Sequence, residues 1–162
     1  MTTDDPEPLA LGRLVTNLQS LEFVLRLLLH DLVGPKTLSL DLEKLSVGET
    51  VPENPITNYD SFGDVIRKVN ELLEAHAKPE RIDPSLAHLR DAIAHGRVLA
   101  SHPTGPFSLV KFSKPKAGVV KVTVAEQLTL PWLDTQIKRT YSEITKARAA
   151  ARSLGLSCFP GP

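Results

Sequence analysis

Cysteines, metal-binding histidine pairs and nucleotide-binding glycine motifs are scarce or missing in this sequence, and each absence excludes a class of protein. Cys158 is the only cysteine among 162 residues, so the chain forms no internal disulfide and no cysteine-based metal cluster. The five histidines show neither the H-E-x-x-H nor the H-x(3–5)-H spacing of a metal-binding helix. G-x-S-x-G, the Walker loop and G-x-G-x-x-G do not occur either. We therefore expect no metal and no other cofactor.

Long apolar runs are also missing. A membrane-spanning helix needs roughly 20 apolar residues, and the longest run here, residues 24–32, is interrupted by Arg26, His30 and Asp31. The N-terminal M-T-T-D-D-P-E-P is acidic and lacks the basic and then apolar order of a signal peptide. Together with the single cysteine, these features predict a cytoplasmic protein with no membrane partner.

The remaining composition is that of a globular domain. The chain is 41% hydrophobic, an ordinary fraction, and a chain of this length buries roughly two-thirds of its unfolded surface. We expect a disordered arm over residues 1–8, a single helical domain over residues 9–155 and a flexible tail over residues 156–162.

The net charge of zero hides a division along the chain. Residues 1–87 hold 8 Lys and Arg against 15 Asp and Glu, whereas residues 88–162 hold 11 against 4. Such asymmetry is typical of a nucleic-acid-binding face. It is equally typical of two halves that attract each other across the fold or across a dimer, and the sequence leaves both interpretations open.

Apolar residues recur at three- and four-residue steps in the first and last parts of the chain, which predicts long helices there. The first helix spans about residues 9–33 and ends before Gly34-Pro35. The last begins at Thr129 or Leu130, ahead of Pro131, and runs to about Leu154. Its expected buried stripe is Leu133, Ile137, Tyr141 and Ile144.

Two shorter helices have clear start signals. Ser61 and Asp64 form an S-x-x-D start for a helix that continues to about Ala77. Asp83 suits the N-cap of the next helix and Pro84 its first position. Gly96 follows His95 where a left-handed residue would close that helix.

Between these helices lie an irregular stretch and a hairpin. Residues 34–60 have little periodicity, and a connection of this length is uncommon in a compact domain. Residues 107–112 and 119–124 read as two strands joined by a Lys- and Gly-containing turn. The predicted fold is mainly α, a four-to-five-helix bundle with one small β-hairpin before the last helix.

The segment L-R-D-A-I-A-H-G-R, residues 89–97, concentrates side chains that can act on a phosphodiester. Arg90 is permanently charged and can bind two phosphate oxygens. The imidazole of His95 exchanges its proton near neutral pH, and Arg97 adds positive potential. A phosphate held by Arg90 with His95 beside a ribose 2′-hydroxyl would allow RNA cleavage without metal, because that reaction needs proton transfer and charge stabilisation.

The same segment resembles the R-x(4–6)-H signature of HEPN domains (higher eukaryotes and prokaryotes nucleotide-binding), in which a polar residue often follows the Arg. The resemblance implies a helical bundle of HEPN type, a catalytic pair formed by Arg90 and His95, and an accessory role for Asp91. It also implies a homodimer whose two signatures face each other, RNA as substrate, and a place in defence or toxin–antitoxin control with an antitoxin as a candidate partner. In one toxin branch a Tyr stands two residues after the His, whereas this chain has Arg97 there.

Alternatives remain beside this hypothesis. Arg90, Asp91 and His95 can be ordinary surface and helix-end residues, and the chain a non-catalytic dimeric module that binds a nucleotide, RNA or a protein. Lys138 and Arg139 make the last helix basic, which suits a solvated face as well as an RNA backbone. Lysines in and between the two strands, including Lys111, are expected to protect an exposed sheet edge. Glu22 is expected to pair with Arg26 on the surface or to orient a site residue as a partly buried carboxylate.

Overall fold

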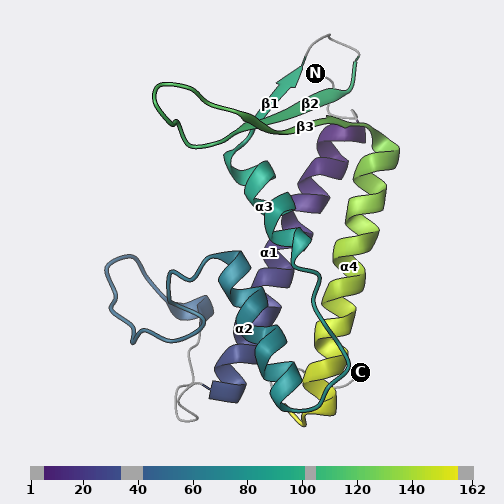
Figure 1. Cartoon of the computed structure of the whole chain (residues 1–162). Helices are drawn as coiled ribbons and strands as arrows, with labels where there is room; N and C mark the ends of the chain where they lie inside the picture. Colours follow the sequence, from purple (N-terminus) through teal and green to yellow (C-terminus); the bar gives the residue numbers. More distant parts are fainter. Residues whose placement is uncertain (1–5, 34–41, 101–104, 157–162) are drawn as a thin grey trace. The chain divides into compact units, whose positions relative to one another are not determined.

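The computed structural model describes residues 6–33, 42–100 and 105–156, which form a mainly α-helical protein with a small antiparallel sheet. The elements are α1 (Pro6–Val33), η1 (Leu42–Lys44), α2 (Phe62–Ala75), α3 (Ser85–His95), β1 (Arg97–Ala100), β2 (Phe107–Phe112), β3 (Val122–Leu128) and α4 (Leu130–Ser153) (Figure 1). The chain divides into two compact units, of which one contains residues 1–21 and 83–144 and the other residues 22–82 and 145–162. No helix among the described residues has the length and hydropathy that a membrane crossing requires.

The first unit contains α3, the sheet and the N-terminal parts of α1 and α4. The strands are antiparallel in the order β1-β2-β3, with Leu109 of β2 opposite Val98 of β1 and Glu126 of β3. Leu109 and Leu128 are buried, and both point to the face of the sheet that α3 covers. Alternate residues of a strand share a face, so the intervening residues point to the opposite side. The other buried apolar side chains of this unit are Leu14, Leu18, Leu21, Leu86, Ala92, Leu133 and Ile144.

The sequence predicted a single hairpin, and the sheet has a third strand. β1 starts directly after Gly96, and its four residues are all exposed, so no apolar alternation marked it. β3 also starts later and ends later than the predicted 119–124, because residues 116–119 form the turn. Lys111 lies on the central strand β2, so the prediction that it protects a sheet edge is wrong.

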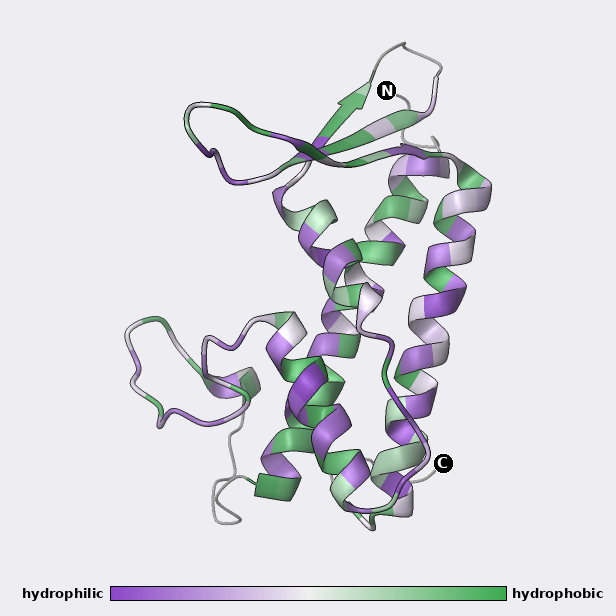
Figure 2. Ribbon diagram, viewed as in Figure 1, coloured by the Kyte–Doolittle hydropathy of each residue, from purple (hydrophilic) through white to green (hydrophobic). Residues whose placement is uncertain are grey.

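The second unit is built on the C-terminal half of α1 and on α2, both coloured strongly hydrophobic in part (Figure 2). Ser61 caps α2 by accepting a hydrogen bond from the Asp64 backbone N–H at 3.2 Å, as predicted. Arg26 pairs with Glu22 at 2.9 Å, and its guanidinium also donates to the Asp60 carbonyl oxygen at 2.6 Å. Glu22 thus pairs with Arg26 as predicted, in a partly buried position, and this pair ties the loop before α2 to α1.

Helix bounds agree closely with the predicted ones. α1 begins at Pro6, so residues 6–8 are helical where a disordered arm was expected, and residues 1–5 and 157–162 lie outside the described residues. α4 ends before Gly155, which has the left-handed φ of +71°. Tyr141 was expected in the buried stripe of α4 and is 63% exposed, because Thr140, Glu143 and Ile144 take the buried positions of that turn.

The N-terminus of α3 is attached to α4 by an ion pair. Asp83 Oδ1 accepts a hydrogen bond from the Ser85 backbone N–H at 2.9 Å, and Asp83 Oδ2 lies 2.6 Å from Arg139 Nη2. Burial alone would raise the pKa of Asp83, but the hydrogen bonds from Ser85 and Arg139 outweigh it and lower that pKa from 3.8 to about 2. The predicted N-cap is therefore wrong by one residue, because Pro84 occupies that position without a side-chain hydrogen bond and Asp83 instead accepts from the first residue of α3. Arg139 has a structural partner in Asp83.

Replacing Asp83 by Ala should lower the free energy of unfolding at pH 7 by about 1 kcal/mol, the usual effect of losing a side-chain hydrogen bond, here the one from the Ser85 backbone N–H. Because the folded-state pKa is lowered, the contribution of the charge is present above pH 4 and is lost as the pH falls from 4 to 2. Urea unfolding at several pH values measures this, and the difference from wild type should shrink at the acidic end. The matched control is Asp134→Ala, which removes the exposed pair with Lys138 and should change stability by less than about 0.5 kcal/mol.

Candidate functional site

His95 and Asp91 lie together at the C-terminal end of α3. The His95 side chain is 64% exposed, and its Nε2 is 3.7 Å from Asp91 Oδ1, one helical turn earlier. Asp91 Oδ2 also accepts a hydrogen bond from Lys111 Nζ of β2. The Asp91 carboxylate thus lies beside both the imidazole of His95 and the Lys111 ammonium of the sheet.

Arg90 faces a different direction from His95. It lines a pocket of about 270 Å³ between α3 and the N-terminal part of α1, and it is partly buried there. Five residues along an α-helix turn the side chain by about 140°. The other residues that line this pocket are Val15, Leu18, Gln19, Ile93 and Ala94, and His95 is not one of them. This pocket therefore contains Arg90 without His95.

Gly96 fixes the end of α3 for a reason other than the predicted one. Its backbone is extended, with φ −76° and ψ −178°, so the expected left-handed conformation is wrong. A Cβ atom at this position would lie 2.4 Å from the Ala92 carbonyl oxygen and 2.7 Å from Leu109 Cδ1. Glycine is required here because the last turn of α3 and strand β2 approach too closely for any side chain.

The basic residues proposed for RNA binding lie in three different settings. Arg97 is exposed, and its guanidinium donates to the His95 carbonyl oxygen at 3.3 Å. Lys138 is exposed and pairs with Asp134 at 2.6 Å. Arg139 binds Asp83 beside the N-terminus of α3, which is about 15 Å along the helix axis from His95. Only Arg97 is therefore next to His95.

Lys111 is the residue of this site that sequence reasoning missed. Residues 107, 109 and 111 share one face of β2, and Phe107 and Leu109 are apolar on that face. The sequence did contain a sign of this contact, which is a lysine that alternates with inward-facing apolar residues. A charged side chain on a covered face needs an acidic partner, and this pattern therefore indicates an ion pair.

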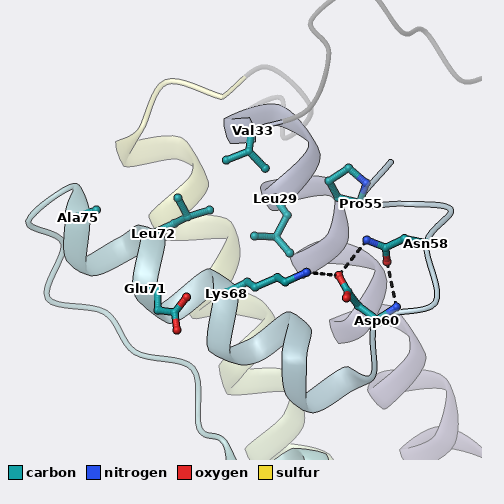
Figure 3. Close-up of a pocket in the computed structure, with 9 residues that line it drawn as sticks. All are labelled: Leu29, Val33, Pro55, Asn58, Asp60, Lys68, Glu71, Leu72 and Ala75. Atoms are coloured by element: carbon teal, nitrogen blue, oxygen red, sulfur yellow. Dashed lines mark hydrogen bonds and ion pairs between the residues drawn. The ribbon is translucent and has the colours of Figure 1, made fainter. Parts of the chain in front are cut away.

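A second pocket, of about 510 Å³, lies in the second unit between α1, α2 and the preceding loop (Figure 3). Its polar groups bind one another. Lys68 Nζ is 2.6 Å from Asp60 Oδ2, and Asn58 donates to the same oxygen at 2.9 Å. The hydrogen bond from Lys68 lowers the pKa of Asp60. The walls are mainly apolar, so we interpret these polar contacts as fastening the loop to α2.

Comparison with protein-family models, with curated proteins and with solved structures found no match for this chain. The resemblance to HEPN domains therefore rests on the residues of the α3 segment alone. Among the described residues, no three His, Cys, Asp or Glu side chains come together as a metal-binding group.

Replacing Gly96 by Ala should destabilise the protein by about 1–3 kcal/mol, the usual cost of forcing an extra methyl group into a packed site. The control is Gly12→Ala in α1, where a Cβ meets nothing within 4 Å and should stabilise the helix by about 0.5–1 kcal/mol. Urea unfolding measures both changes. A Gly96→Ala protein as stable as wild type would show that α3 and β2 do not pack as closely as described.

Proposed function

We propose that this protein is a metal-independent endoribonuclease of HEPN type that works as a homodimer. The observation that supports this most is the exposed imidazole of His95, held at a fixed helix end beside the Asp91 carboxylate. An accessible histidine in such a position is suited to proton transfer at a bound substrate. Arg97 adds positive charge next to it, which favours a phosphate-containing substrate.

The proposed reaction is attack of a ribose 2′-hydroxyl on the adjacent phosphorus. His95 accepts the proton of that hydroxyl as the new P–O bond forms, and Arg90 binds the phosphate oxygens on which negative charge increases. The bond to the 5′-oxygen breaks, and that oxygen takes up a proton from the solvent, to which His95 returns the proton it accepted. The products are a 2′,3′-cyclic phosphate and a 5′-hydroxyl. Asp91 acts as a positioning residue for the imidazole.

Two copies of the chain are part of this proposal because Arg90 and His95 diverge within one copy. In a two-fold dimer, Arg90 of one chain can meet the phosphate that lies beside His95 of the other. Ala94, which lines the Arg90 pocket, is small and exposed, so it would let a second helix approach closely. By the same resemblance, we propose a role in defence or toxin–antitoxin control, with an antitoxin as partner.

The second candidate function is a non-catalytic dimeric module that binds a nucleotide, RNA or a protein. The observation that favours it is the separation of Arg90 from His95, together with the pairing of Asp91 with Lys111. In such a module, residues 89–97 would pack the end of α3 against the sheet. The protein would catalyse no RNA cleavage, so substitutions in this segment would change stability only.

Cleavage of labelled RNA in EDTA separates these functions. We expect wild-type protein to cleave and His95→Ala to lose a factor of about 10²–10⁴ in rate, the usual contribution of a general acid or base. Arg90→Ala should lose a comparable factor through charge stabilisation. The matched control is His88→Ala, which removes an exposed histidine of the same helix and should leave the rate unchanged.

Thermal unfolding is measured for each variant, so that a loss of cleavage is not confused with a loss of folding. Because the His95 side chain is exposed, we expect its replacement to cost little stability. Asp91→Ala should reduce the rate less than His95→Ala. Products that carry a 2′,3′-cyclic phosphate would agree with the proposed route. Cleavage that survives His95→Ala, or no cleavage of any RNA by wild-type protein, would contradict the proposal.

A further inference from the structure

The face of the sheet that points away from α3 is apolar at its centre. On β2, residues 108, 110 and 112 share this outer face, opposite the buried Leu109. The register places Arg97 and Ala125 beside Val110, Leu99 beside Ser108, and Val122 beside Phe112. We call Leu99, Val110, Phe112 and Val122 the outer apolar patch.

None of the residues that the structure describes covers the outer apolar patch. Leu99 is 51% exposed, Phe112 45% and Val122 58%. A small antiparallel sheet ordinarily presents polar side chains on its solvated face. An exposed aromatic ring between aliphatic neighbours is instead typical of a surface that binds a partner.

Positive charge surrounds this patch. Apart from Lys111, which points to the inner face and pairs with Asp91, residues 97–128 contain four Lys and Arg and one acidic residue, Glu126. Lys114, Lys116 and Lys121 are exposed on the turn that follows Phe112, and Arg97 lies on the outer face beside Val110. This charge complements a polyanion, while the ring of Phe112 offers a stacking surface for a base.

We propose that the outer apolar patch and the turn lysines bind single-stranded RNA. Bases stack on Phe112 and contact Leu99 and Val122, while the lysines bind the phosphates. β1 begins two residues after His95, so the strand that carries Leu99 follows directly on the helix that carries the imidazole. This inference rests on the proposed function, since it assigns the substrate-binding surface of the same enzyme.

The test measures RNA affinity in the full chain that carries His95→Ala, so that cleavage does not interfere. The probe is a fluorescently labelled single-stranded RNA of mixed sequence, and its anisotropy gives the dissociation constant at several salt concentrations. Phe112→Ala should weaken binding about tenfold or more, as loss of one stacked base implies. Phe112→Tyr should bind like the parent, because it keeps the ring.

Two further variants keep the test decisive if Phe112→Ala does not fold. Val122→Glu places a negative charge on the exposed patch and should also weaken binding. Replacing Lys114 and Lys116 by Glu should lower the slope of log affinity against log salt by about 0.7 for each phosphate that the protein no longer neutralises. The matched control is Tyr59→Ala, which removes a fully exposed aromatic side chain of the second unit and should not change affinity.

Affinity within twofold of the parent in folded Phe112→Ala and Val122→Glu would overturn the inference. So would a Phe112→Ala protein that becomes monomeric by light scattering yet binds RNA as the parent does, because the patch would then be a contact between copies. The same experiments distinguish a failure of the nuclease proposal from a failure of this inference. RNA binding through the patch without cleavage by wild-type protein overturns only the nuclease, and His95-dependent cleavage that ignores the patch overturns only this inference.

Discussion

The close contact between the last turn of α3 and strand β2 determines where the candidate site lies. Because residue 96 has no side chain, the Ala92 carbonyl oxygen and Leu109 can both approach its backbone, and the chain leaves the helix in an extended conformation. That geometry ends the helix at His95 and starts β1 at Arg97. It also sets which face of the sheet α3 covers, and hence which side chains are left on the outer face. The catalytic hypothesis and the proposed RNA-binding surface both depend on this one contact.

The charge division along the chain is used in part for contacts within the fold. Arg139 from the basic half pairs with Asp83 from the acidic half, which is attraction across the fold. Lys111 is engaged by Asp91 at the end of α3. The lysines of the turn after β2, in contrast, are exposed around an apolar patch. Attraction between the halves therefore accounts for Arg139, whereas a nucleic-acid-binding face stays a prediction for the exposed lysines.

The helices could be predicted from the sequence because their signals are local. Leucine spacing marked α1, the Ser61 cap marked α2 and Asp83 marked the start of α3. What could not be predicted depends on residues far apart in the chain. The extended conformation of Gly96, strand β1 and the Asp91–Lys111 pair all follow from packing of α3 on the sheet. The pattern R-x4-H likewise predicted which residue types form the candidate site. It could not predict that the Arg90 side chain lies in the pocket against α1 and that His95 does not, because this depends on how α3 packs.

The central claim is that Arg90 and His95 act together only across two copies of the chain. Mixing inactive Arg90→Ala and His95→Ala chains, with refolding to exchange subunits, tests it most directly. A heterodimer would hold one intact site, with Arg90 from one chain and His95 from the other, so the mixture should recover roughly a quarter of wild-type RNA cleavage. A mixture that contains heterodimers and stays as inactive as either variant alone would contradict the account.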